Sequence, residues 1–336
     1  MPSKAALTGD IDTGRLHGLD ALRGIAAMAV VIMHAHVLFP QFPDLFPRGY
    51  LAVDFFFVLS GYVMARTYEP RLAAGMRPMA FFTARYRRLW PTMALGGILF
   101  LAFLPEGTRG EDIPLLGVAM VNLLLLPNPW SRNSFALNVP AWSIFFELVA
   151  NLAHGVFWRI SNCGLVALIV LAGALLGYLA RDHGHLDIGS RSGDVLEGLS
   201  RVATAYAMGV LVWRSWGQRR IDPLLGILAL IVMPLWFAIP ERIDGTNWLW
   251  DVAFVYVLCV PLLLGGLALQ GARRLSTIAG ELSFPLYALH YPLLYWIRAW
   301  GLSAGVAIVG CVLCAGIFAW AQLAWRNRHS QDKNVI

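Results

Sequence analysis

The sequence has few charged residues for its length. Asp, Glu, Lys and Arg make up 14% of the 336 residues, whereas 58% of the residues are hydrophobic. A soluble domain carries about 25% charged and about 45–50% apolar residues, so this composition excludes an ordinary soluble protein. Apolar runs that approach the thickness of a bilayer recur along the whole chain. We therefore predict an all-α fold, a polytopic bundle of membrane helices.

Cysteine and the common signatures of metal and nucleophile sites are also scarce. The four cysteines, Cys163, Cys259, Cys311 and Cys314, form no disulfide framework. The last two lie one turn apart in an apolar segment, which favours small packing residues over a metal or redox pair. The chain has no His-Glu-x-x-His, no Gly-x-Ser-x-Gly and no glycine-rich phosphate loop. We expect no metal and no tightly bound cofactor.

Eleven apolar segments are candidates for membrane spans. They are residues 21–39, 50–68, 90–105, 113–127, 139–158, 165–180, 196–213, 223–240, 248–269, 281–301 and 305–325. The first segment has no convincing small-x-small cleavage site at its end, so we interpret it as a retained span and not as a signal peptide.

The basic residues gather in alternate connections between these segments. Residues 66–88 contain six arginines, and 214–222, 270–276 and the C-terminal tail are also basic. The positive-inside rule places such segments in the cytoplasm. The net charge of +6 therefore reflects membrane orientation, and we expect no nucleic-acid partner.

Three connections that include acidic residues, 105–112, 181–197 and 240–247, are expected outside. Connections 105–112 and 181–197 lie on the same side of the membrane only if one of the three apolar segments between them does not cross it. The sequence leaves open which of 113–127, 139–158 and 165–180 this is. We favour the first as re-entrant or interfacial, because it has only about 15 residues and contains Pro114 and Asn122. Ten spans then remain, with both termini cytoplasmic.

The chain shows no internal repeat, low-complexity tract or domain linker. We expect one membrane domain over residues 16–325. A polar N-terminal tail, 1–15, precedes it, and a cytoplasmic C-terminal tail, 326–336, follows it.

Arg23 and His34 share the first apolar segment. On a helix their spacing of 11 positions gives about 3 turns, roughly 16 Å of rise, and places both within about 20° of one face. Ionisable residues inside a membrane are costly and indicate a functional site, here the lining of a passage. The alternative is that Arg23 lies at the interface and His34 bonds a neighbouring helix.

Two further groups of polar residues lie near the ends of spans. Asp54 enters the second span near its external end, where it would orient or charge-balance a histidine, or else cap a helix. Arg85 and Arg88 precede the third span at its cytoplasmic edge. Guanidinium groups match phosphate oxygens, although such clusters also set topology or bind anionic lipid.

Glu147, Asn151 and His154 fall on one face of a predicted helix and are expected to point inward. Glu147 has no cation beside it in the sequence. Its partner must therefore come from another helix, and the whole group is either functional or a structural buried pair.

Ser283, Tyr287 and His290 also share one helical face. Pro285 between them is tolerable if it lies in the first turn of the helix. The alternative to a functional role is hydrogen bonding between helices, which is common for such residues.

These clusters, in this order, resemble the integral-membrane acyltransferase-3 family. The matching elements are Arg23-x10-His34, Val53-Asp-x-Phe-Phe-x-Leu-Ser-Gly61, Arg85-x-x-Arg88 with Pro91, Trp142-Ser-Ile-x-x-Glu147 and Ser283-Phe-x-x-Tyr287-x-x-His290. They extend over roughly residues 15–325. Ala52, Phe284 and Ala288 depart from the usual Gly, Tyr and Leu, and the departure at 284 removes a hydroxyl.

The resemblance implies a bacterial inner-membrane enzyme that transfers an acyl group, often acetyl, to a hydroxyl of a glycan or lipid-linked acceptor. The donor would be acyl-CoA, with acetyl-CoA the expected form. Its phosphates would meet Arg85 and Arg88 in the cytoplasm, and its pantetheine arm would pass Arg23 toward His34.

The resemblance also implies roles around the thioester. An unperturbed imidazole titrates near pH 6.5, so His34 would take a proton from the acceptor hydroxyl, or would carry the acyl group covalently. Asp54, Glu147 and His290 would orient His34 or the acceptor, and Tyr287 would donate to the oxyanion.

Two other classes of protein remain as alternatives. In a transporter or flippase of a glycan or acyl species, the same residues would line a path without chemistry. In a membrane-embedded sensor or scaffold they would be structural only. Release of free thiol from acyl-CoA distinguishes an enzyme from both.

Overall fold

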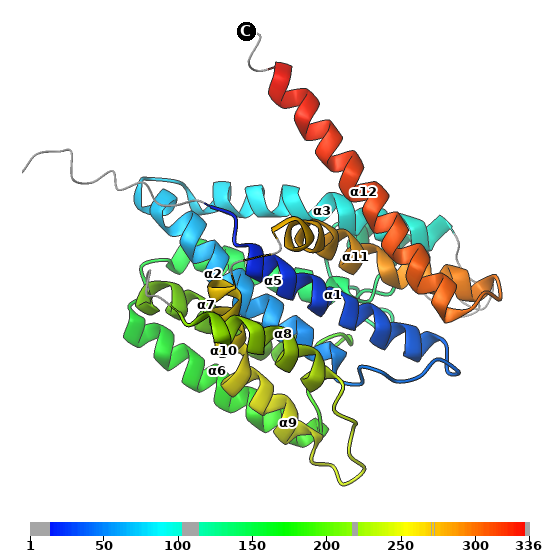
Figure 1. The fold of residues 1–336 in the computed structure, drawn as a ribbon, viewed down its shortest axis with the longest axis horizontal. Helices are drawn as coiled ribbons and strands as arrows, with labels where there is room; N and C mark the ends of the chain where they lie inside the picture. The colour runs from blue at the N-terminus through cyan, green and yellow to red at the C-terminus, as the bar shows by residue number, and fades with distance from the viewer. Residues whose placement is uncertain (1–13, 103–113, 217–220, 270, 272, 333–336) are drawn as a thin grey trace, which may run out of the picture.

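The computed structural model describes residues 14–102, 114–216, 221–269, 271 and 273–332, and over these residues the fold is a helical bundle with no β-strand (Figure 1). The helices are α1 His17–Leu38, α2 Ala52–Ala73, α3 Pro78–Ala102, α4 Leu115–Leu123, α5 Ala141–Phe157, α6 Asn162–His183, α7 Val195–Trp216, α8 Pro223–Phe237, α9 Asn247–Ala253, α10 Cys259–Ala268, α11 Arg273–Ala299 and α12 Ala304–Asp332. A short 3₁₀ turn, Gly49–Leu51, precedes α2, and a π-helical turn, Phe254–Leu258, joins α9 to α10.

Each predicted apolar segment contains one of these helices, with α9 and α10 sharing one segment. Within the described part of the chain, six helical segments have the length and composition to cross a membrane: His17–Leu38, Gly49–Ala73, Asn162–His183, Val195–Trp216, Asn247–Ala268 and Ala304–Ala324. The protein is therefore a multi-pass α-helical membrane protein, as predicted. The number of ten spans stays a prediction.

Three helix ends differ from the predicted spans. The third helix begins at Pro78 and not near residue 90, α11 begins at Arg273 and not near 281, and α12 continues to Asp332. Hydropathy marks only the apolar part of a helix, whereas arginine is a good helix former and extends it into polar surroundings. Of the predicted tails and loops, 1–13, 105–112 and 333–336 lie outside the described residues.

The early start of α11 corrects the expectation for Pro285, which lies in the interior of the helix together with Pro292. A proline lacks the N–H that would bond the carbonyl four residues earlier. For Pro292 that carbonyl belongs to Ala288, and it accepts a hydrogen bond from Asn138 Nδ2 at 2.8 Å. A side chain from another segment thus satisfies the freed group, as membrane helices require.

The short helix α4 does not have the length of a span. Its nine residues extend about 14 Å, against a hydrocarbon thickness of about 30 Å. Its end reaches the middle of α3, where Trp90 Nε1 donates to the Leu123 carbonyl at 2.7 Å and the Tyr86 hydroxyl donates to the Leu124 carbonyl at 3.2 Å. This geometry supports the re-entrant interpretation of residues 113–127.

The connections predicted to be basic and cytoplasmic lie together at one end of the bundle. Arg66 of α2 donates to the Gly14 carbonyl before α1 at 3.3 Å, and Arg15 donates to the Thr277 carbonyl of α11 at 3.1 Å. These contacts join the start of α1 to α2 and α11. We refer to this region as the arginine-rich end.

The connections predicted to be external meet at the opposite end. The Ser134 N–H donates to the Ser190 carbonyl at 3.0 Å, and the Trp248 N–H donates to the Gly184 carbonyl at 3.0 Å. Segments 181–197 and 240–247 therefore share one end, in agreement with the predicted alternation.

Helices α1 and α11, which carry the two intramembrane histidines of interest, pack along each other near the middle of the bundle (Figure 1). Their close approach depends on small residues, because a side-chain carbon at Gly24 would lie 2.7 Å from the Ala279 Cβ. Small residues allow such contact between membrane helices. The packing places His34 beside His290.

Candidate active site

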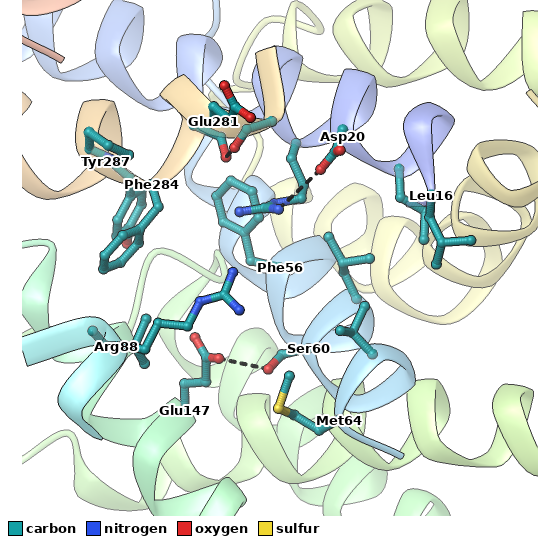
Figure 2. Close-up of a pocket in the computed structure, with 18 of the residues that line it drawn as sticks. Leu16, Asp20, Phe56, Ser60, Met64, Arg88, Glu147, Glu281, Phe284 and Tyr287 are labelled. Carbon is teal, nitrogen blue, oxygen red and sulfur yellow. Dashed lines mark hydrogen bonds and ion pairs between the residues drawn. The ribbon is translucent and has the colours of Figure 1, made fainter. Parts of the chain in front are cut away.

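A cavity of about 490 Å³ lies at the arginine-rich end, between α1, α2, α3, α5, α11 and α12 (Figure 2). Its charged lining consists of Arg15, Arg23, Arg66, Arg85, Arg88, Asp20, Glu147 and Glu281. Five arginines and three carboxylates leave an excess of two positive charges, which suits an anionic ligand. The three arginines that the sequence analysis assigned to donor binding thus meet in one cavity.

The base of this cavity contains an ion pair between α3 and α5. Arg85 is 6% exposed, and its Nη2 donates to Glu147 Oε1 at 2.8 Å. The Ser60 hydroxyl of α2 donates to the same oxygen at 2.7 Å (Figure 2). The expectation that Glu147 finds its cation on another helix is confirmed. The Arg85 Nε is buried without a hydrogen-bond partner among the described residues.

A second network of charged residues joins the start of α1 to α11 at the edge of the cavity. Asp20 accepts from Arg23 Nη1 at 3.3 Å and from Arg15 Nε at 2.6 Å, and Arg15 Nη1 reaches Glu281 of α11 at 2.8 Å. Figure 2 shows Arg88 on the side of the cavity near Glu147, with its side chain directed inward. Cationic groups of α1 and α3 therefore face each other across the space.

His34 and His290 form a hydrogen-bonded pair deeper in the bundle. His34 Nδ1 lies 3.1 Å from His290 Nε2, and the ring centroids are 5.0 Å apart. His290 Nδ1 lies 2.8 Å from the Tyr287 carbonyl and 3.1 Å from the Leu286 carbonyl. A carbonyl oxygen only accepts, so the proton of a neutral His290 is on Nδ1 and its Nε2 is an acceptor.

This assignment determines the tautomer of His34. Because His290 Nε2 accepts, His34 Nδ1 donates to it, and the Val30 carbonyl at 3.0 Å accepts from the same N–H. The lone pair of His34 is then on Nε2. His34 therefore presents an unprotonated nitrogen, as a general base or nucleophile requires.

Tyr287 stands between the cavity and the histidines. It lines the cavity, and its ring centroid is 5.9 Å from that of His290. Its hydroxyl bonds the Ser143 hydroxyl at 2.7 Å, and the Phe56 ring meets it edge-on at 5.7 Å. Neither histidine belongs to the cavity lining in the described part of the chain. The predicted passage from Arg23 to His34 is therefore closed in this structure by aromatic side chains.

Asp54 has a different partner from the one expected. Its two oxygens accept from Arg201 Nε at 3.1 Å and Nη2 at 2.6 Å, and both side chains are fully buried. Arg201 also lies over the Trp142 ring, 5.1 Å from its centroid. The structure thus places Asp54 in a bidentate ion pair with Arg201. Asp54 lies neither beside a histidine nor at the N-cap of α2, which is Leu51. The signal in the sequence was Arg201 itself, an intramembrane cation that needs a carboxylate.

Asn151 and His154 point inward, as predicted, but into a separate cluster. His154 bonds the Tyr206 hydroxyl at 2.8 Å and Glu69 at 3.1 Å, and Tyr206 donates to Asn151 Oδ1 at 3.1 Å. These contacts tie α5 to α2 and α7. Residues on one polar face of α5 therefore have two different roles: Glu147 lines the cavity, whereas Asn151 and His154 bond neighbouring helices.

The described residues contain neither a metal-binding cluster nor a disulfide. No group of three or more His, Cys, Asp or Glu side chains is placed to hold a metal ion there. All four cysteines are free thiols.

Comparison with known proteins assigns the chain to a family. The model of the acyltransferase-3 family, described as an acyltransferase domain, matches residues 16–326. Protein 2 of the picA locus of Rhizobium radiobacter is 37% identical over 40% of this chain and 78% of its own length. The exopolysaccharide production protein ExoZ of Rhizobium meliloti (strain 1021) is 24% identical over 80% of this chain and 84% of its own length.

A Staphylococcus aureus (strain COL) protein named as a putative O-acetyltransferase is 21% identical over 87% of this chain, which spans 52% of that relative. No solved structure matches. The family match extends over the helices that build both the arginine-lined cavity and the histidine pair. The chain therefore belongs to the acyltransferase-3 family.

Proposed function

We propose that the protein transfers an acyl group, with acetyl the expected one, from acyl-CoA to a hydroxyl of an envelope or exported glycan or a lipid-linked acceptor. The enzyme would lie in the bacterial inner membrane with the arginine-rich end and both termini in the cytoplasm. The observation that carries the proposal is the arrangement of an arginine-lined cavity directly behind a histidine pair whose outer member has a free Nε2.

The donor site follows from the charges of the cavity. Arg23 and Arg88 line it with guanidinium groups that match the phosphate oxygens of CoA. Arg85 lines the same space and pairs with Glu147, but it is buried, whereas Arg88 is exposed and Arg23 half-buried. We therefore assign Arg88 and Arg23 to direct phosphate contact and Arg85, with Glu147, to the shape and charge of the cavity floor.

The transfer step uses the tautomer of His34. Its Nε2 takes the proton from the acceptor hydroxyl as the oxygen attacks the thioester carbonyl. The carbonyl oxygen becomes an oxyanion, for which the Tyr287 hydroxyl is the proposed donor. Collapse of the intermediate breaks the C–S bond, and the leaving CoA sulfur recovers the proton from His34. The products are the ester and free CoA.

Donor access requires Tyr287 to move, because its ring lines the cavity and lies against His290, with Phe56 packed on it. The thioester then passes from the arginine-lined space to His34. An acyl group carried covalently on His34 Nε2 is the second form of this mechanism, and it uses the same nitrogen and the same route.

The acceptor class rests on the family and on its named relatives. One of them is named for exopolysaccharide production and another as an O-acetyltransferase. A polymeric glycan acceptor would approach from the end opposite the arginines. His34, four residues before the end of α1, lies toward that end.

The test uses purified protein in vesicles with acetyl-CoA and envelope glycan from a deletion strain, freed of esters by mild base. Free thiol and ester-linked acetyl should appear together, and His34→Ala should abolish both. His36→Ala is the matched control, because His36 bonds only the Phe42 carbonyl, at 2.6 Å, and should stay near wild type. Movement of substrate across the vesicle without thiol release would instead support a transporter.

A further inference from the structure

Asp187 is held rigidly by its two neighbours at the end opposite the arginines. The Leu186 N–H donates to Asp251 Oδ2 at 2.9 Å, and the Ile188 carbonyl accepts from Arg201 Nη1 at 2.8 Å. Leu186 and Ile188 are 0% and 3% exposed, whereas Asp187 between them is exposed. Two buried ion pairs thus fix the backbone on both sides of one exposed carboxylate.

Both anchors converge on the turn that contacts α1. The Tyr50 hydroxyl donates to Asp251 at 2.8 Å, and the Tyr50 carbonyl accepts from Arg201 at 3.3 Å. The preceding residue, Gly49, lies so close to α1 that an added side-chain carbon would be 3.0 Å from the Met33 Cβ. Met33 is the neighbour of His34. The loop that carries Asp187 is therefore fastened over the part of α1 that carries the histidine.

The charge of the Asp187 carboxylate acts on the buried Arg201, but no described side chain is bonded to it. In the part of the chain that the structure describes, it accepts no hydrogen bond and forms no ion pair, and its backbone N–H alone bonds His185. The carboxylate is nevertheless close enough for its charge to act on His34. By contrast, Arg201 binds both oxygens of Asp54, and the carboxylate of Asp251 accepts from Arg48, from the Tyr50 hydroxyl and from the Leu186 N–H.

His34 is accessible from a direction other than the donor cavity. Its residue is only half-buried, yet it does not belong to the lining of the arginine-rich cavity. An acceptor that reaches Nε2 from the opposite end would therefore pass Asp187. Carboxylates are strong acceptors for hydroxyl groups, because the hydrogen bond is charge-assisted.

We infer that Asp187 is an acceptor-binding residue, whose carboxylate accepts hydrogen bonds from hydroxyl groups next to the one that is acylated. The acceptor unit would then be a polyol, such as a sugar with adjacent free hydroxyls, and not an isolated alcohol. This inference rests on the proposed function. It adds a residue from the loop between α6 and α7 to a site otherwise built from α1, α2, α3, α5, α11 and α12.

The experiment measures acyl transfer from acetyl-CoA to the base-treated envelope glycan for the wild type, Asp187→Asn, Asp187→Glu and Asp182→Asn. Asp182 is the control, an exposed carboxylate at the end of α6 on the same side. Loss of a charge-assisted contact should raise the KM for the glycan roughly tenfold in Asp187→Asn. Asp187→Glu should recover part of this loss, and Asp182→Asn should match the wild type.

Two further measurements separate binding from other roles. The KM for acetyl-CoA should be unchanged in Asp187→Asn, and the slow hydrolysis of acetyl-CoA without glycan should fall by much less than the KM for the glycan rises. An equal fall in hydrolysis would overturn the inference, because Asp187 would then act on His34 and not on the acceptor. An unchanged KM for the glycan would overturn it as well. If the wild type releases no thiol, the proposed function fails first, independently of any Asp187 variant.

Discussion

Replacement of His290 should affect the rate far less than replacement of His34. The hydrogen bonds of the pair assign the free Nε2 to His34 and leave His290 as the acceptor that holds its partner's Nδ1–H, over 3.1 Å. We therefore predict that His290 positions His34 and neither takes the proton nor carries the acyl group.

The expected magnitudes follow from these contacts. Loss of a general base costs about 10²–10⁴ in rate, and His34→Ala should show that loss. In His290→Leu the His34 N–H loses one neutral hydrogen bond and keeps the other, to the Val30 carbonyl. One such bond contributes about 1 kcal/mol, or roughly a fivefold change in kcat. In His290→Gln the amide oxygen can accept in place of Nε2, and the rate should return close to wild type.

The assay is thiol release from acetyl-CoA with saturating glycan, with the folded fraction of each variant checked by size-exclusion chromatography and thermal unfolding. His290 is fully buried, so a lower melting temperature alone does not bear on its role. A His290→Gln enzyme that folds normally but is as inactive as His34→Ala would refute the reasoning. In that case His290 would carry the chemistry and the assigned tautomers would be reversed.

Three other predictions test the donor site, the buried ion pairs and the orientation. Arg88→Gln should raise the KM for acetyl-CoA about tenfold or more with little change in kcat, because a charge-assisted contact contributes about 1.5–3 kcal/mol; Arg88→Lys should recover only part of it, and complete recovery by Lys would reduce Arg88 to a topological charge. Asp54→Ala should lower the free energy of unfolding by about 3–5 kcal/mol, since it leaves Arg201 buried without a counter-ion; thermal unfolding in detergent measures this, and an unchanged melting temperature contradicts the structural role. In a cysteine-free background, a cysteine at Asp187 should be labelled from outside intact cells and one at Arg77 should not; the reverse pattern inverts the membrane orientation and removes the cytoplasmic donor site.

Local properties of the sequence determined much of this protein. Hydropathy and the distribution of arginines indicated the helices and the two ends where the loops meet, because both depend on how each segment partitions between lipid and water. Helical periodicity correctly predicted that Glu147, Asn151 and His154 point inward. The cost of a charge in a membrane marked Asp54 as a residue that needs a partner.

Only the tertiary structure decided which partner each residue has. Asp54 meets Arg201 across 147 positions of sequence, and His34 meets His290 across 256. Periodicity reports the face on which a side chain lies, but the helix opposite that face depends on how all the helices pack. For the same reason the sequence placed Arg23 and His34 in one passage, whereas packing inserts the ring of Tyr287 between the cavity and the histidine pair. The depth of a residue is a local property, whereas its neighbours are a property of the whole bundle.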